Sequence, residues 1–210
     1  MIMKNIILVK GDMRSGTNIV IDHFEAYGYR RVGTHGQESI VIDKDKKTII
    51  HDHSIDYFPE YLKRTFVFLV LRKNLLAQAL SQLMFLQIKE SLNKKQIEKI
   101  GNVYYPKRYI PIEPFEVNQH RVFKMICRIN QNNKAKLELI QQKNLEHSIV
   151  YFEDFVQDSF KYFNHYTHNL LHKRKYKHIV PTPYQAKDLV TNYKELQDWW
   201  KTLPYRRKIL

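Results

Sequence analysis

Near its N-terminus the chain reads Ile6-Ile7-Leu8-Val9-Lys10-Gly11-Asp12-Met13-Arg14-Ser15-Gly16-Thr17-Asn18. An apolar, β-branched run leads into a loop with a glycine at each end, and residues 19–27 then predict a helix that Gly28 stops. A strand, a tight loop and a helix in this order present backbone N–H groups to a phosphate at the helix N-terminus. The stretch therefore predicts an anion-binding loop in a parallel α/β sheet.

The two glycines of this loop have the spacing of a nucleotide-binding loop, Gly-x-x-x-x-Gly-Lys-Ser/Thr. Thr17 stands where the lysine is expected, and Asn18 stands where the magnesium-binding hydroxyl is expected. A positive charge lies inside the loop instead, at Arg14. The loop thus suits a phosphate but lacks two groups that metal-assisted phosphoryl transfer uses.

Length and composition predict one domain over residues 1–210, with a surface excursion or lid over residues 88–118. The single cysteine, Cys127, excludes an intramolecular disulfide framework and favours a cytoplasmic protein. The N-terminal residues predict a first strand rather than a signal peptide, and no run of about 18 apolar residues predicts a membrane span.

The chain is strongly basic, with a formal net charge of +14 and a pI near 9.7. Such a charge implies an anionic partner. On charge alone, nucleic acid, a membrane surface, a polyanionic cofactor and an acidic substrate all remain open.

The apolar runs predict further strands, and a long periodic segment predicts a helix over residues 119–142. The predicted strands are 39–42, 48–53, 65–71 and 147–152, with residues 29–38 between them and the first helix as an active-site-sized loop. Strands that alternate with helical segments indicate a parallel sheet with helices on both faces. A final helix is predicted to open at Asn192 with a capping box.

The strand over residues 65–71 ends at Arg72, and a helix with a polar stripe follows. Asn74, Gln78 and Ser81 fall at i, i+4 and i+7, so they share one helix face. Ligands bind at the carboxyl ends of the strands in open α/β folds. We therefore expect this stripe to face a ligand.

Four segments then form one pattern: Arg14-Ser15-Gly16-Thr17-Asn18, residues 49–53, residues 71–81 and Phe152-Glu153-Asp154-Phe155. Together they resemble the sulfotransferases that use 3′-phosphoadenosine-5′-phosphosulfate (PAPS). The first is similar to that family's 5′-phosphosulfate loop, and residues 71–81 are similar to its 3′-phosphate element. The resemblance is nearest to the bacterial trehalose/lipopolysaccharide-type branch, in which an Asp stands at the position of Asn74.

The resemblance implies an α/β fold with a P-loop-like parallel sheet and transfer of a sulfuryl group from PAPS without a metal. Arg14 would neutralise the charge that develops on the leaving phosphate. Ser15, Gly16, Thr17 and Asn18 would bind the phosphosulfate. Arg72 and Ser81 would hold the 3′-phosphate, the arginine through charge-assisted hydrogen bonds.

The acceptor hydroxyl, on a carbohydrate, a glycolipid or a small molecule, needs a base within hydrogen-bond reach. His53 is the first candidate, because it ends a predicted strand at the position of the family's base. Glu38 is the second, since bacterial relatives place a glutamate after the first helix. His35 and His51 rank below both.

Two other functions are consistent with parts of the sequence. One is a small-molecule or nucleotide kinase with a divergent loop, and the other is a basic nucleic-acid-binding module without catalysis. The resemblance favours a small-molecule or carbohydrate partner over nucleic acid. His165, His168 and His172 share a helix face, but a solvated basic helix is favoured there over a metal site because no cysteine or carboxylate joins them.

Overall fold

The computed structural model describes residues 6–34, 46–56, 65–92, 111–157 and 185–204. The chain forms two compact units, Met1–Lys73 with Gln131–Ile179 and Asn74–Asn130 with Val180–Leu210. Compact units alone do not decide how many domains a chain has, so the single domain over residues 1–210 stays a prediction. Within the described part of the chain, no helix combines the length and the hydrophobicity needed to cross a bilayer.

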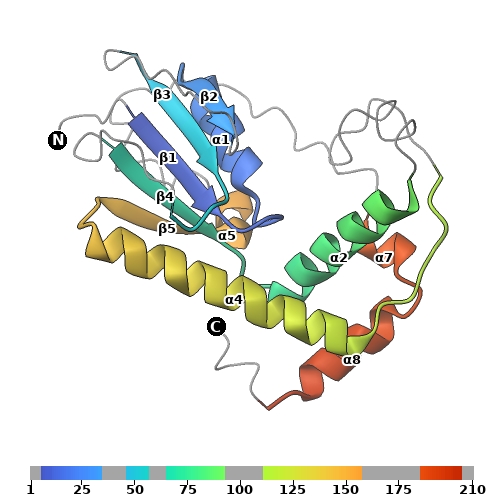
Figure 1. Cartoon of the computed structure of the whole chain (residues 1–210). Coiled ribbons are helices and arrows are strands. Elements are labelled where there is room, and N and C mark those ends of the chain that lie inside the picture. Colours follow the sequence, from blue (N-terminus) through green and yellow to red (C-terminus); the bar gives the residue numbers. More distant parts are fainter. Residues whose placement is uncertain (1–5, 35–45, 57–64, 93–110, 158–184, 205–210) are drawn as a thin grey trace. The chain divides into compact units, whose positions relative to one another are not determined.

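The first unit is built on a five-stranded sheet in which every strand is parallel to its neighbours (Figure 1). The strand order is β2-β3-β1-β4-β5. The strands are β1 (Ile6–Gly11), β2 (Arg30–Thr34), β3 (Thr48–Asp52), β4 (Thr65–Leu71) and β5 (His147–Tyr151). The predicted α/β fold class is thus confirmed.

β1 lies at the centre of this sheet, and all of its residues are buried. Its Ile7 pairs with Ile49 of β3 and with Phe66 of β4. Because successive side chains point to opposite faces, Ile7 and Ile6 contribute to different cores. A strand whose side chains are apolar on both sides therefore requires cover on both faces of the sheet.

Helices supply this cover. On one face, α1 (Thr17–Ala26) and α5 (Phe152–Gln157) bury Ile21, Phe24 and Phe155 in the core that contains Ile7. On the other face, α4 (Gln119–Gln142) buries Ile140 in the core that contains Ile6. The prediction of helices on both faces is confirmed.

The second unit contains α2 (Leu75–Ser91), α7 (Ala186–Leu189), α8 (Tyr193–Thr202) and the N-terminal part of α4. Its main core includes Leu80, Ile126 and Leu196. Asn74 is the N-cap of α2, since its Oδ1 accepts a hydrogen bond from the N–H of Ala77 at 3.0 Å. This residue of the predicted polar stripe therefore has a structural role.

Two sequence predictions are wrong. Residues 29–38 were expected to form a loop, but Arg30–Thr34 is β2, an edge strand paired with β3. Asn192 precedes α8 without a side-chain capping bond; its Nδ2 donates to the carbonyl of Val117, and its Oδ1 accepts from the Val117 N–H. The predicted strand 39–42, most of the excursion 88–118 and the three histidines between 165 and 172 lie outside the described residues.

Candidate active site

The loop over residues 11–18 lies at the point between β1 and β4 where the strand order of the sheet reverses. The connection from β1 leads to β2 on one side of the sheet, and the connection from β4 leads to β5 on the other side. Since β1 and β4 are neighbours, with Gly11 opposite Val70, their carboxyl ends open side by side. Open α/β sheets bind ligands at the carboxyl ends of the strands where the strand order reverses in this way. Arg72 follows β4 directly into the same region.

Neighbouring atoms lie so close to Gly11 and Gly16 that neither position has room for a side chain. A Cβ on Gly11 would collide with the Ser15 hydroxyl and would lie 2.8 Å from the carbonyl oxygen of Val70. A Cβ on Gly16 would collide with the ring of Phe152, and Gly16 also has a φ of +99°. Arg14 adopts a φ of +62°, which is rare for a residue with a side chain. The loop conformation therefore carries strain of the kind found at functional sites.

The loop presents several unsatisfied donors. No side chain caps the N-terminus of α1, whose N-cap is Gly16. The hydroxyl of Ser15 is buried, with its side chain 1% exposed, and it makes no hydrogen bond to any described residue. Helix N-terminal amides favour an anion, and a buried hydroxyl without a partner is costly. Both features suit a bound oxyanion.

Arg14 and Arg72 bring two positive charges to this loop. Burial lowers the pKa of Arg72, Glu153 raises it, and Arg14 lowers it. The Arg72 guanidinium carbon lies 4.2 Å from the ring centre of Phe152, and its Nε lies 4.0 Å from Glu153 Oε1 and makes no hydrogen bond to a described residue. Two positively charged side chains at one loop favour an anionic ligand.

The segment after β5 holds the end of β4. Glu153 Oε2 accepts a hydrogen bond from the N–H of Lys73 at 3.0 Å, and Asp154 forms an ion pair with the Lys73 ammonium group. Phe152 contributes the ring against which Arg72 and Gly16 pack. The Phe-Glu-Asp-Phe segment therefore positions Arg72 and the loop.

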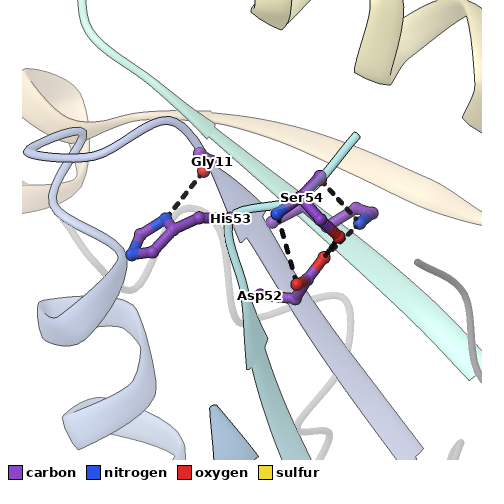
Figure 2. A network of polar contacts seen from close by, with 5 residues as sticks. Gly11, Asp52, His53 and Ser54 are labelled. Carbon is purple, nitrogen blue, oxygen red and sulfur yellow. Dashed lines mark hydrogen bonds and ion pairs between the residues drawn. The ribbon is translucent and has the colours of Figure 1, made fainter. Parts of the chain in front are cut away.

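His53 follows β3 and turns toward the start of the loop, whereas Asp52 turns toward Ser54 (Figure 2). The Nδ1 atom of His53 lies 2.9 Å from the carbonyl oxygen of Gly11. A carbonyl only accepts, so Nδ1 carries the proton, and Nε2 of the neutral ring keeps its lone pair. Burial lowers the pKa of His53, which favours this neutral form.

His51 connects β2 to the first residue of α1. The Nη2 of Arg31 lies 3.1 Å from His51 Nδ1, and the hydroxyl of Thr17 lies 2.8 Å from His51 Nε2. An arginine only donates, so Nδ1 accepts, and the neutral ring donates through Nε2 to Thr17. Burial, His53 and Arg31 lower the pKa of His51 to about 3. The Thr17 hydroxyl oxygen accepts this hydrogen bond, so the hydroxyl can donate its own proton to another group.

A buried ion pair lies on the other side of β3. Lys10 donates to Asp52 and to the carbonyl oxygen of Ser54, and the hydroxyl of Ser54 donates to Asp52 at 2.7 Å (Figure 2). Both charged side chains are almost fully buried. Asp52 is thus occupied by protein partners, and this group fixes the end of β3 against β1.

The structure brings most of the predicted site residues together. Those that lie at or beside the loop, all within the first unit, are Arg14, Ser15, Gly16, Thr17, Asn18, His53 and Arg72. Ser81 is a half-buried residue of α2 in the second unit. Glu38 and His35 lie outside the described residues.

Two residues near the site were not predicted. Arg31 was read as part of a loop, although an arginine on an edge strand reaches a histidine of the next strand. Lys136 belongs to the predicted helix over residues 119–142 and was assigned no role, but its side chain is 0% exposed. Its sequence signal is its spacing from Ile129 and Ile140, which places a lysine on the apolar face of α4. Comparisons with models of protein families, with curated proteins and with solved structures find no match to the chain.

Proposed function

We propose that the chain is a sulfotransferase that moves a sulfuryl group from PAPS to a hydroxyl of a carbohydrate, a glycolipid or a small molecule. The observation that carries the proposal is the loop at the start of α1, where no side chain caps the helix, the buried Ser15 hydroxyl has no partner among the described residues, and Phe152 packs against both Gly16 and Arg72. A donor with a phosphosulfate and a second phosphate offers anionic groups to both Arg14 and Arg72. The buried Ser15 hydroxyl would gain an acceptor on binding.

The chemistry assigned to the chain is an in-line displacement at sulfur. His53 Nε2 takes the proton of the acceptor hydroxyl while that oxygen bonds to sulfur, and the bond from sulfur to the bridging phosphate oxygen breaks. Arg14 and the first amides of α1 stabilise the charge that develops on the leaving 5′-phosphate. Arg72 is assigned to the 3′-phosphate. The roles of Ser81 at that phosphate and of Glu38 as a second base stay predictions.

A thermal-shift comparison tests the proposal without knowledge of the acceptor. Adenosine 3′,5′-bisphosphate should raise the melting temperature more than AMP or ATP with magnesium, because only the bisphosphate carries both phosphates. Equal shifts, or none for the bisphosphate, would contradict the proposal, and a larger shift with ATP and magnesium would favour a kinase. Salt-sensitive binding to any nucleic acid strand that is indifferent to Arg72→Ala would indicate a nucleic-acid-binding module.

A further inference from the structure

Lys136 is a fully buried lysine that has no hydrogen-bond partner in the described part of the chain. Its side chain is 0% exposed, and its Nζ makes no hydrogen bond to any described residue. An ammonium group that loses water without gaining acceptors is strongly unfavourable, and lysines are almost never fully buried unless they are paired. The residue therefore calls for a partner, and the described residues supply none.

The position of Lys136 on α4 directs it toward the loop. One turn before it, Asn132 Nδ2 lies 3.4 Å from Asp12 Oδ2, and one turn after it, Ile140 packs in the core with Leu8. Residues four apart lie on one helix face, so Lys136 lies between these two contacts. Side chains on a helix lean toward its N-terminus, which is here the end nearer to Asp12 and the loop.

The carboxylates in this region are already engaged by other donors. Asp12 accepts from the N–H of Met13 at 2.9 Å and from Asn132, and Asp52 accepts from Lys10 and Ser54. Burial lowers the pKa of Lys136, Asp12 raises it, Lys10 lowers it and Asp52 raises it. The contact of Asn132 with Asp12 brings this face of α4 to the loop, and the Lys136 ammonium group makes no hydrogen bond to any described residue.

We propose that Lys136 binds a tetrahedral oxyanion, phosphate or sulfate, that is held by residues 11–18. It supplies from a distant helix the cation that Thr17 does not provide after Gly16. This inference rests on the part of the proposed function that makes the loop an anion site. The flexible four-carbon stem of lysine allows the ammonium group to turn toward such an anion.

The test measures binding of inorganic sulfate and inorganic phosphate, separately, by titration calorimetry. Lys136→Met should lower the affinity for whichever anion binds by about tenfold or more, because hydrogen bonds to a charged group are strong. The matched control is Lys134→Met on the same helix, since Lys134 is 77% exposed and forms an ion pair with Glu138. This control should change the affinity less than twofold, and comparison of the two anions shows which one the site prefers.

The melting temperature provides a second test of the role of Lys136. Lys136→Met should raise the melting temperature of the free protein, because it removes a buried charge without a partner. A lower melting temperature with unchanged anion affinity would make Lys136 a structural counterion of Asp12 and overturn the proposal. Lys136→Gln keeps a polar end without the charge, so anion affinity at the wild-type level in that variant would also overturn it.

Adenosine 3′,5′-bisphosphate separates this inference from the proposed function. If sulfate or phosphate binds through Lys136 but the bisphosphate gives no shift, the sulfotransferase proposal fails and the anion site stands. If the bisphosphate binds wild type and Lys136→Met equally, the role of Lys136 fails and the sulfotransferase proposal stands.

Discussion

The ring of His53 is hydrogen-bonded to the carbonyl oxygen of Gly11, the residue that ends β1 and opens the loop. The two residues are 42 positions apart, yet parallel pairing of β1 with β3 places their strand ends together. One hydrogen bond thus sets both the position of the ring and the nitrogen that keeps its lone pair. Movement of the loop would move the proposed base with it.

Replacement of His53 by glutamine should reduce turnover and leave donor binding intact. The glutamine amide still donates to the Gly11 carbonyl, but it cannot accept a proton, so we expect kcat to fall by about 10²–10⁴-fold. The measurement is release of adenosine 3′,5′-bisphosphate from PAPS, with water in place of the acceptor. The thermal shift with the bisphosphate is the control and should match wild type. Unchanged turnover in this variant would rule out His53 as the base.

Turnover by the wild-type protein should also depend on pH in a defined direction. His53 acts as a base only when neutral, and burial holds its pKa below the ordinary 6.5. The rate should therefore be constant near neutral pH and fall on the acid side with a midpoint below pH 6.5. A midpoint above that value, or a rate that rises as the pH falls, would assign the base to another group.

Replacement of Arg14 by alanine should abolish transfer while part of the donor affinity survives. In the proposed mechanism Arg72 and the amides at the start of α1 remain to bind the donor, but the leaving phosphate loses the cation assigned to it. We expect a loss of about 10²-fold or more in kcat, similar to the loss of one oxyanion donor. Arg30→Ala is the control, because Arg30 is an exposed arginine on β2. Equal losses in the two variants would argue against a specific role for Arg14.

Gly16 and Gly28 form a matched pair for testing the loop. Both have positive φ values, +99° and +85°, but only a Cβ on Gly16 would collide with Phe152, whereas one on Gly28 meets nothing within 4 Å. Gly28→Ala should therefore cost only the strain of a side-chain-bearing residue in a left-handed backbone conformation, about 1–2 kcal/mol in the free energy of unfolding. Gly16→Ala should cost more and should be partly rescued by Phe152→Leu. Equal costs in chemical denaturation would show that Phe152 does not limit the loop.

The elements that the sequence predicts best are those whose signal is local. The apolar run over residues 65–71 matches β4, and the periodic segment over residues 119–142 matches α4. β2 was missed because Arg30, Arg31 and Gly33 disfavour a strand locally, and only the backbone pairing with β3 makes it one. At the sheet edge this pairing is one-sided, which leaves room for charged side chains.

The same distinction applies to the site. The loop was predicted because its glycines and its arginine lie within eight residues of one another. The link from Arg31 through His51 to Thr17 was not predicted, since it joins three separate elements. Asn132 of α4, one turn before Lys136, contacts Asp12 of the loop only because α4 returns along the sheet. Such contacts follow from topology, which no local pattern encodes.

The role of Asn192 can be tested by replacement with aspartate. As a helix cap, aspartate would serve as well as asparagine, so stability would be unchanged. Instead, the structure pairs Nδ2 of Asn192 with the carbonyl of Val117 at 2.9 Å, and a carboxylate oxygen in that place would face another acceptor. We expect Asn192→Asp to lower the free energy of unfolding by about 1–3 kcal/mol, measured in urea. A neutral result would restore the capping interpretation.

Stability should decrease as the pH falls below neutral, and His23 provides a direct test. It is buried between Tyr27 and Phe155, and burial lowers its pKa from 6.5 to about 4. Between these values the unfolded chain binds a proton that the folded chain does not, so the free energy of unfolding falls as the pH falls from 6.5 toward 4. His51 acts in the same direction down to about pH 3.

Replacement of His23 by phenylalanine keeps an aromatic ring against Phe155 and removes this proton. Between pH 7 and pH 5 the variant should lose about 2 kcal/mol less stability than wild type, as linkage predicts for a shift of this size. The comparison uses urea unfolding at both pH values, so a constant cost of the larger ring cancels. Equal losses in the two proteins would mean that His23 is protonated in the folded chain at pH 5.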